Sequence, residues 1–149
     1  MLIRKIIEND KPEIFDILKK EIGLEYLEEM LIEWDNALKG NYVNAYVALE
    51  DKNIIGYITL EKKVKTYYIG TVVVSPNLQN NGIGTELINY IKQECGKKNE
   101  GNVILNVVTD ADAQRTITFY LKCGFEISGH VKDEYIPGTN QVHLSLKIM

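Results

Sequence analysis

Cysteine is scarce in this sequence, and long hydrophobic runs are absent from it. The two cysteines, Cys95 and Cys123, have no CxxC spacing and no histidine nearby, so we expect small buried side chains rather than zinc ligands. No run of about 18 apolar residues occurs, so the sequence predicts no transmembrane helix and no membrane partner. The N-terminal apolar stretch is too short for a signal peptide, which makes a cytoplasmic location the default expectation.

Basic clusters are also lacking. No group of lysines or arginines exceeds the pairs Lys62-Lys63 and Lys97-Lys98, and the net charge is -4. Nucleic acids need a surface rich in lysine and arginine, so a nucleic-acid partner is not expected. A single small anionic ligand is compatible with this charge, because backbone amides at the start of a helix can hold phosphate.

The composition that is present is typical of a soluble globular chain. Of the 149 residues, 45% are apolar and 26% are charged. The length fits one domain spanning residues 1–149, and no linker, repeat or low-complexity segment divides it. Homodimers are the commonest oligomers, but the sequence leaves the quaternary state open.

Hydrophobic periodicity predicts a mixed α/β fold in the order β-α-α-β-β-β-α-β-α-β-β. The expected strands cover residues 2–7, 42–49, 54–60, 66–74, 103–108, 125–135 and 141–148. The expected helices begin at Asn9 or Asp10, at Leu24, at Gly82 and at a capping Asp112, and they end near Gly23, Gly40, Gly96 and Gly124. The strand at 103–108 is almost wholly apolar, which predicts burial on both of its faces.

Residues 72–85 carry the clearest chemical signal. A buried strand leads into a polar loop, two glycines and an amphipathic helix, and free amides at such a helix start bind anions. A Walker A loop would need a lysine, which Gly84-Thr85 lacks. A Rossmann fingerprint would need a third glycine, where this chain has Leu87. The pattern that is present is Gln-x-x-Gly-x-Gly at residues 79–84.

This pattern resembles the acetyl-CoA loop of the GCN5-related N-acetyltransferase (GNAT) superfamily. Residues 72–76, Val-Val-Val-Ser-Pro, resemble the strand that precedes that loop. Residues 119–125 resemble the family's Tyr-x-x-x-Gly-Phe motif, with Tyr120 as its tyrosine. The element order matches as well, so the resemblance covers nearly the whole chain. It implies an acyl-CoA N-acyltransferase-like fold with a splayed central sheet.

By this resemblance the chain is an N-acetyltransferase that moves the acetyl group of acetyl-CoA to a primary amine by direct attack in a ternary complex. Val72 and Val74 would pair with the pantetheine arm, and amides in residues 79–85 would hold the pyrophosphate. The family often has an asparagine seven positions before the tyrosine; this chain has Ala113 there, so Gln114 or Asp112 would substitute. The implied cofactor-binding residues are Val72, Val73, Val74, Gln79, Asn80, Asn81, Gly82, Ile83, Gly84 and Thr85.

Tyr120 is the implied catalytic residue. A phenol with a pKa of about 10 is a weaker acid than a thiol at about 8.5, so we expect Tyr120 mainly to hydrogen-bond the leaving sulfur. A backbone amide near Val72 or Val73 would stabilise the developing oxyanion. Glu33 and Glu61 are candidates for the general base, and deprotonation through water without a dedicated carboxylate is the alternative.

The acceptor amine is not identified by the sequence. The resemblance places its site near residues 24–40 and 130–140, whose acids and aromatics, including Trp34 and Tyr135, suit a small cationic amine or a peptide amine. No metal is implied. Two other hypotheses stay open: a non-catalytic acyl-CoA-binding or regulatory module on the same fold, and a nucleotide-binding enzyme with an unrelated loop.

Overall fold

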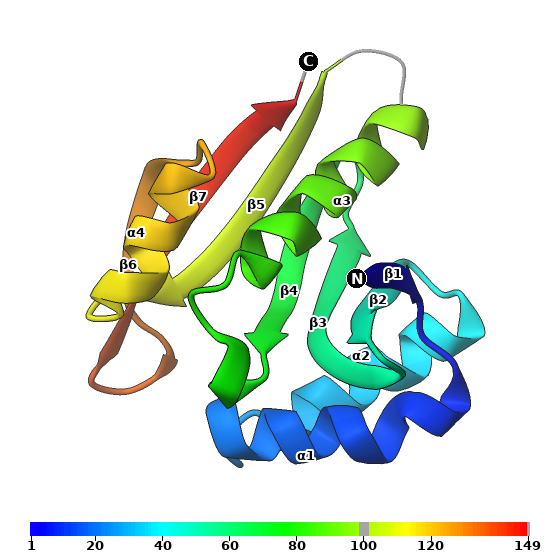
Figure 1. The fold of residues 1–149 in the computed structure, drawn as a ribbon. Helices are drawn as coiled ribbons and strands as arrows, with labels where there is room; N and C mark the ends of the chain where they lie inside the picture. The colour runs from blue at the N-terminus through cyan, green and yellow to red at the C-terminus, as the bar shows by residue number, and fades with distance from the viewer. Residues whose placement is uncertain (99–101, 149) are drawn as a thin grey trace.

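One mixed sheet of seven strands organises the chain, in the spatial order β1-β2-β3-β4-β5-β7-β6 (Figure 1). The computed structural model describes residues 1–98 and 102–148. The strands are β1 (Leu2–Lys5), β2 (Val43–Glu50), β3 (Asn53–Lys62), β4 (Thr66–Val74), β5 (Val103–Asp110), β6 (Glu126–Ile136) and β7 (Thr139–Ile148). The helices are α1 (Lys11–Glu21), α2 (Leu27–Lys39), α3 (Ile83–Lys98) and α4 (Gln114–Lys122). This order confirms the prediction, with two short 3-10 turns added, η1 (Glu8–Asp10) and η2 (Pro76–Leu78).

Helix ends were easier to predict than helix starts. The stops at Gly40 and Gly124 are confirmed, and both glycines have the positive φ, 73° and 99°, that a left-handed cap needs. The second helix begins at Leu27 rather than Leu24. The predicted Asp112 cap is wrong: α4 has Ala113 as its N-cap, with no side-chain capping bond. A tight turn explains this, because the backbone amide of Ala113 already donates to the carbonyl of Asp110 at 3.0 Å.

Two hydrophobic cores lie on opposite faces of the sheet. Helices α1 and α2 cover one face, with Ile14, Leu18 and Trp34 fully buried against β2 and β3. Helix α3 covers the other face through Leu87 and Ile88, and α4 adds to the same core. Burial of such side chains is the main source of stability for this architecture. Among the described helices, none is long and apolar enough to cross a bilayer.

Strand β5 is buried less evenly than its apolar sequence predicts. Val103, Leu105 and Val107 are buried on the face toward α3 and α4, whereas the alternate residues Ile104 and Asn106 are only partly buried. The prediction of burial on both faces is therefore wrong. The physical reason lies in the helices, because α1 and α2 pack over the β2–β4 half of the sheet and leave this face of β5 without a helix above it.

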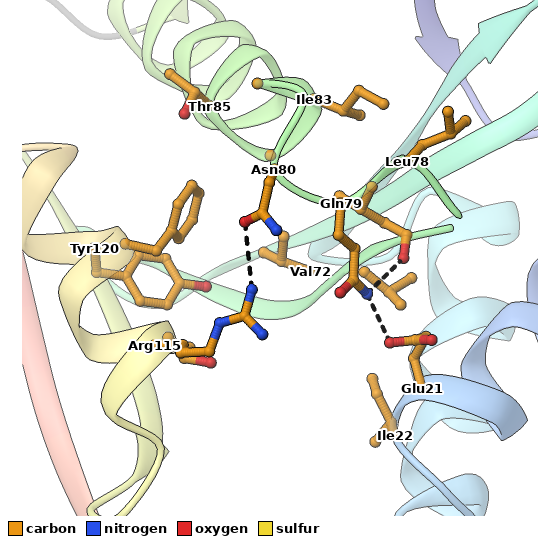
Figure 2. A pocket seen from close by; sticks show the side chains of 16 residues that line it. Glu21, Ile22, Val72, Leu78, Gln79, Asn80, Ile83, Thr85, Arg115 and Tyr120 are labelled. Carbon is orange, nitrogen blue, oxygen red and sulfur yellow. Dashed lines mark hydrogen bonds between the residues drawn. The ribbon is translucent and has the colours of Figure 1, made fainter. Parts of the chain in front are cut away.

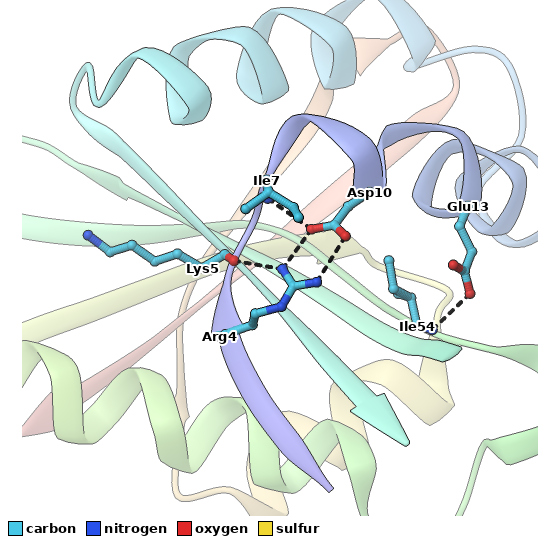
Figure 3. A network of polar contacts seen from close by, with 6 residues as sticks. All are labelled: Arg4, Lys5, Ile7, Asp10, Glu13 and Ile54. Carbon is cyan, nitrogen blue, oxygen red and sulfur yellow. Dashed lines mark hydrogen bonds and ion pairs between the residues drawn. The ribbon is translucent and has the colours of Figure 1, made fainter. Parts of the chain in front are cut away.

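The first strand is tied to the start of the first helix by a partly buried ion pair (Figure 3). Arg4 donates to both carboxylate oxygens of Asp10, at 2.8 and 3.0 Å, and the Ile7 amide donates to Asp10 at 2.9 Å. Asp10 therefore acts through this network rather than as a side-chain cap of α1. In the same view, Glu13 of α1 accepts a 2.8 Å hydrogen bond from the backbone amide of Ile54 in β3.

Strand β4 changes its partners halfway along. Residues 66–69 pair in parallel with residues 104–107 of β5, and that pairing ends at Ile69 and Val107. The pairing with β3 continues to Val74, but its register shifts so that Gly70 and Thr71 together oppose Thr59, which is a β-bulge. Beyond the bulge, β4 and β5 diverge toward their C-terminal ends (Figure 1). This divergence is the splay expected from the family resemblance.

Candidate active site

A groove of about 670 Å³ lies where β4 and β5 separate. The end of β4, the following loop, the start of α3, one side of α4 and the end of α1 line it (Figure 2). Tyr120 and all of the implied cofactor-binding residues except Asn81 line the groove, whereas the candidate bases Glu33 and Glu61 are not among its lining residues. The fold thus brings Tyr120 to the segment 72–85, as the ordered motifs predicted.

One wall of the groove is an open strand edge. Backbone groups in an antiparallel strand face alternate edges. The amide of Ser75 donates to the Ile55 carbonyl in β3 at 2.8 Å, so Val73 also faces β3, whereas Val72 and Val74 face away from it. Because β5 no longer pairs there, the N–H and C=O groups of Val72 and Val74 point along an edge that a ligand can extend.

The N-terminus of α3 forms a second wall. Its first main-chain bond runs from the Glu86 amide to the Gly82 carbonyl at 3.0 Å, so the amides of Ile83, Gly84 and Thr85 have no acceptor within the helix. Gly82 has a φ of 80°, which favours glycine. Gly84 allows close packing: a Cβ there would lie 3.1 Å from the Phe119 ring of α4. These amides and the helix dipole form an anion site.

Tyr120 stands on the opposite side of the groove, on α4. Its ring is 4% exposed and packs edge-on against Phe119 and Phe125, with centroid distances of 5.1 and 5.3 Å. Figure 2 shows its hydroxyl directed into the groove. Burial, with a smaller contribution from the nearby Cys123, raises the pKa of the Tyr120 phenol well above its usual value. The hydroxyl is therefore a hydrogen-bond donor at every physiological pH.

Polar side chains bridge the groove at two places (Figure 2). Gln79 Nε2 donates to Glu21 at the end of α1, at 2.7 Å, and to the Val74 carbonyl, at 3.3 Å. Arg115 of α4 donates to the side chain of Asn80 at 3.4 Å. Sequence reasoning missed both Glu21 and Arg115. For Arg115 a signal existed, because it lies two positions from Ala113 on the helix that carries Tyr120.

A family comparison agrees with this geometry. The profile of the Acetyltransferase (GNAT) family matches residues 11–125, more than half of the chain. The chain belongs to this family. It is therefore an acyltransferase, and GNAT enzymes take the acetyl group from acetyl-CoA. No curated protein sequence is detectably similar to this acetyltransferase.

Solved structures share the fold of this GNAT protein over its whole length. An aminoglycoside 6'-N-acetyltransferase complexed with coenzyme A is 19% identical, with a TM-score of 0.76 and coverage of 100% of this chain and 98% of that one. The ribosomal-protein-S18-alanine N-acetyltransferase from Escherichia coli is 16% identical, with a TM-score of 0.82 and coverage of 99% and 93%. An aminoglycoside 6'-N-acetyltransferase from Enterococcus faecium is 19% identical, with a TM-score of 0.77 and coverage of 100% and 98%. At these identities the likeness concerns the fold.

The groove of this GNAT protein fits coenzyme A. An extended pantetheine arm carries amides that can pair with the outward backbone groups of Val72 and Val74. A pyrophosphate matches the free amides at the start of α3. Among the described residues that line the groove, Arg115 is the cationic side chain. A Cβ at Gly84 would press on Phe119 and disturb this packing, so the glycine suits the site.

The face of the sheet next to the groove gathers tyrosines and acids. Burial and then the charge of Asp110 raise the pKa of Tyr26 at the start of α2. Burial, Glu134, Tyr26 and Tyr68 raise the pKa of Tyr135 in β6 in the same way, which places these side chains near one another. Trp34, named from the sequence as an acceptor-side aromatic, is instead fully buried in the core, so that expectation is wrong.

The two candidate bases differ in their surroundings. Glu61 pairs with Lys63 at 2.8 Å, and its partner lysine is half exposed. The Glu61 carboxylate thus already has a cationic partner. Glu33 instead accepts a hydrogen bond from Thr71 at the β4 bulge, at 2.8 Å. The structure thus separates two residues that the sequence could not rank.

Proposed function

We propose that this GNAT protein is an N-acetyltransferase that acts on a primary amine by direct attack. The observation that carries the proposal is the arrangement around one groove: the open edge at Val72 and Val74, the free amides of α3, and the Tyr120 hydroxyl opposite them. Each of these groups has a task in acyl transfer from a thioester.

Cofactor binding is assigned to backbone groups and one side chain. Val72 and Val74 extend the sheet by pairing with the pantetheine arm, and the amides of Ile83, Gly84 and Thr85 hold the pyrophosphate. Arg115 adds the charge that an acidic protein otherwise lacks at this groove. It takes the place of the polar contact that Ala113 does not provide.

The chain's own groups prepare the transfer. Bound acetyl-CoA supplies an acetyl group that is activated as a thioester. The outward N–H of Val72 is the backbone donor for negative charge on the acetyl oxygen, because Val73 directs its N–H toward β3. Tyr120 hydrogen-bonds the leaving sulfur, and its raised pKa makes full proton donation less favourable than for a free phenol.

A cationic amine is the acceptor that the neighbouring face favours. Tyr26 and Tyr135 offer aromatic faces, and Asp110 and Glu134 offer negative charge. The Tyr68 ring already has the Lys63 ammonium over it, 5.6 Å from its centroid. Such a surface attracts ammonium groups by charge and by cation–π contacts. Aminoglycosides and a ribosomal-protein alanine are the acceptors named for structures with this fold, so a polyamine-like molecule and a peptide N-terminus are both worth testing.

The test is thiol release from acetyl-CoA with a panel of amines, combined with calorimetric binding of CoA, ATP and NAD. The panel contains kanamycin, spermidine and a peptide with an N-terminal alanine. We expect tight binding of CoA alone and amine-dependent thiol release with at least one compound. CoA binding without release on any amine would instead support a non-catalytic module, which Ala113 favours. Binding of ATP or NAD in place of CoA would support the nucleotide-enzyme hypothesis.

A further inference from the structure

Glu33 of α2 brings a carboxylate to the point where β4 leaves β5. Its Oε1 accepts a 2.8 Å hydrogen bond from the Thr71 hydroxyl, and the Thr59 hydroxyl bonds the same carboxylate. Thr59 Oγ1 in turn accepts a hydrogen bond from the Thr71 amide at 2.9 Å. These bonds fix the carboxylate to both strands of the β-bulge.

Gly70 leaves open the space that this carboxylate fills. A side chain at residue 70 would collide with Glu33 Oε2 and with the Thr59 hydroxyl. Gly70 is itself exposed and Glu33 is partly buried, so the carboxylate lies directly beneath an exposed stretch of the β4 backbone. The bulge, the glycine and the glutamate therefore form one arrangement that presents Oε2 at the surface of the splay.

The carboxylate is held without a counter-charge. Among residues 1–98 and 102–148, no lysine, arginine or histidine forms an ion pair with Glu33. The groups that face it are the hydroxyls of Thr71 and Thr59, with Tyr57 and the like-charged Glu61 on β3. Burial, opposed by the two threonine bonds and aided by Glu61, raises the pKa of Glu33 above its usual value.

A structural role alone does not account for a carboxylate here. Two hydroxyl donors could equally be satisfied by the neutral carbonyl of a glutamine, which avoids the cost of burying a charge. A carboxylate with a raised pKa is a better base than an ordinary one. Catalytic bases commonly have this kind of environment.

The reacting centre of the proposed function lies next to this carboxylate. Thr71, which hydrogen-bonds Glu33, is followed directly by Val72, the proposed donor to the acetyl oxygen. Successive strand residues are about 3.3 Å apart. Glu33 therefore stands one strand position from the backbone donor, on the face of the sheet where α2 begins and the acidic, tyrosine-rich surface lies.

We propose that Glu33 accepts the proton of the attacking amine, a role that rests on the proposed acetyl transfer. The bound ammonium first loses one proton to water through Glu33, which frees the nitrogen lone pair. As that lone pair forms the C–N bond, the next N–H proton passes to Glu33 Oε2. The electron pair of the broken C–S bond leaves with the sulfur, which takes a proton from water. Glu33 then returns its proton to water, so the carboxylate is restored and charge is balanced.

The experiment compares Glu33→Gln, Glu33→Asp and the control Asp16→Asn, which removes an exposed carboxylate of α1 that lies outside both the groove and the proposed acceptor segment. With an amine from the panel that the wild type acetylates, we expect Glu33→Gln to lower kcat by about 100-fold or more. The acidic limb of its pH profile should disappear, while CoA affinity measured by calorimetry stays within about twofold. Glu33→Asp should recover part of the rate, and Asp16→Asn should match the wild type.

A readout without turnover accompanies these rates. The protein is labelled with ¹³C at its glutamate carboxyl groups, and the Glu33 signal is assigned as the one that Glu33→Gln lacks. In the wild type this signal should titrate with a pKa above about 4.3, the value of free glutamate. A Glu33→Gln variant with the wild-type rate and pH profile, or a normal titration, would overturn the role of Glu33 and leave the proposed function intact. A wild type that binds CoA but acetylates no amine would overturn both.

Discussion

At the scale of single residues, Tyr120 offers one hydroxyl in an apolar setting. We expect Tyr120→Phe to lower kcat by about 10- to 100-fold, which corresponds to the loss of one hydrogen bond to a charged sulfur. CoA affinity should change little, because the ring and its packing against Phe119 and Phe125 are retained. Stopped assays of thiol release and calorimetry measure the two effects separately.

The pH dependence sharpens this prediction. Since the pKa of Tyr120 is raised, its hydroxyl stays protonated below pH about 10. Tyr120→Phe should therefore lower kcat by the same factor at each pH and leave the alkaline limb of the pH profile where it is. Tyr42→Phe is the matched control, because Tyr42 is exposed, accepts a hydrogen bond from Asn36 and does not line the groove. A shifted alkaline limb in Tyr120→Phe would contradict the hydrogen-bonding role and favour proton donation.

Arg115 is the residue whose charge matters most for cofactor affinity. We expect Arg115→Ala to weaken CoA binding about fivefold, the scale of one partly exposed charge contact, and to reduce the salt dependence of binding. Lys122→Ala removes an exposed cation from the same helix outside the groove and should leave affinity unchanged. Calorimetry at low and high salt measures both affinities. Equal CoA affinities for Arg115→Ala and Lys122→Ala would refute a specific contact between Arg115 and the cofactor.

At the scale of elements, the approach of α3 to α4 depends on one glycine. Gly84→Ala places a Cβ 3.1 Å from the Phe119 ring, so either the ring or the start of α3 must move. We expect CoA affinity to fall about tenfold, because the amides at this helix start are the proposed ligands of the pyrophosphate. Gly96→Ala in the same helix meets nothing within 4 Å and should instead stabilise the protein by about 0.5–1 kcal/mol. If Gly84→Ala and Gly96→Ala bound CoA with similar affinity, the contact between Gly84 and Phe119 would not matter for cofactor binding.

The link between β1 and α1 has a predictable pH dependence. The pKa of Asp10 is lowered, because its bonds to Arg4 and the Ile7 amide outweigh the opposing effect of burial. A depressed carboxyl pKa gives stability that is complete above the unfolded value of about 3.9 and is lost as pH falls through the folded value. Asp10→Asn should lower the free energy of unfolding by about 2 kcal/mol at pH 7 and by less at pH 3.

A matched control comes from α1 itself. Asp16→Asn removes an exposed carboxylate that pairs with Lys20 at 3.0 Å, and such pairs contribute less than about 0.5 kcal/mol. Urea unfolding at several pH values measures both variants. If Asp10→Asn cost no more than Asp16→Asn, the network in Figure 3 would not be a stabilising one.

Whether each segment forms a helix or a strand was predictable, because this depends on local hydrophobic periodicity and on glycines, such as Gly40, that end helices. The groove residues were predictable because the loop at 79–84 and Tyr120 belong to motifs with fixed spacing. The bulge at Gly70 and Thr71 was not, since it depends on the register between β3 and β4. Glu33 and Thr71 are 38 positions apart. Only the packing of α2 on the sheet brings them together, so the sequence could name Glu33 but not choose it.

At the scale of the whole molecule, the sheet consists of two halves joined by a short ladder. Strands β1–β4 form one half and β5, β7 and β6 the other, and residues 66–69 and 104–107 are the pairs between them. A cofactor laid along the open edge of β4 would complete the pairing where the ladder ends. Cofactor binding should therefore change the hydrogen bonding of alternate backbone groups in β4 and should leave the outer strands nearly unchanged.

Amide hydrogen exchange resolved by NMR can detect this pattern. Without ligand, the Val72 and Val74 amides should exchange fast, because they face the open edge, whereas Val73, which faces β3, should be protected. Saturating CoA should slow exchange at Val72, at Val74 and in the first turn of α3 by tenfold or more, and should leave Val73 and β2 unchanged. Equal protection of all three valines, or none, would mean that the cofactor does not pair with this edge and that the two halves of the sheet are not bridged in this way.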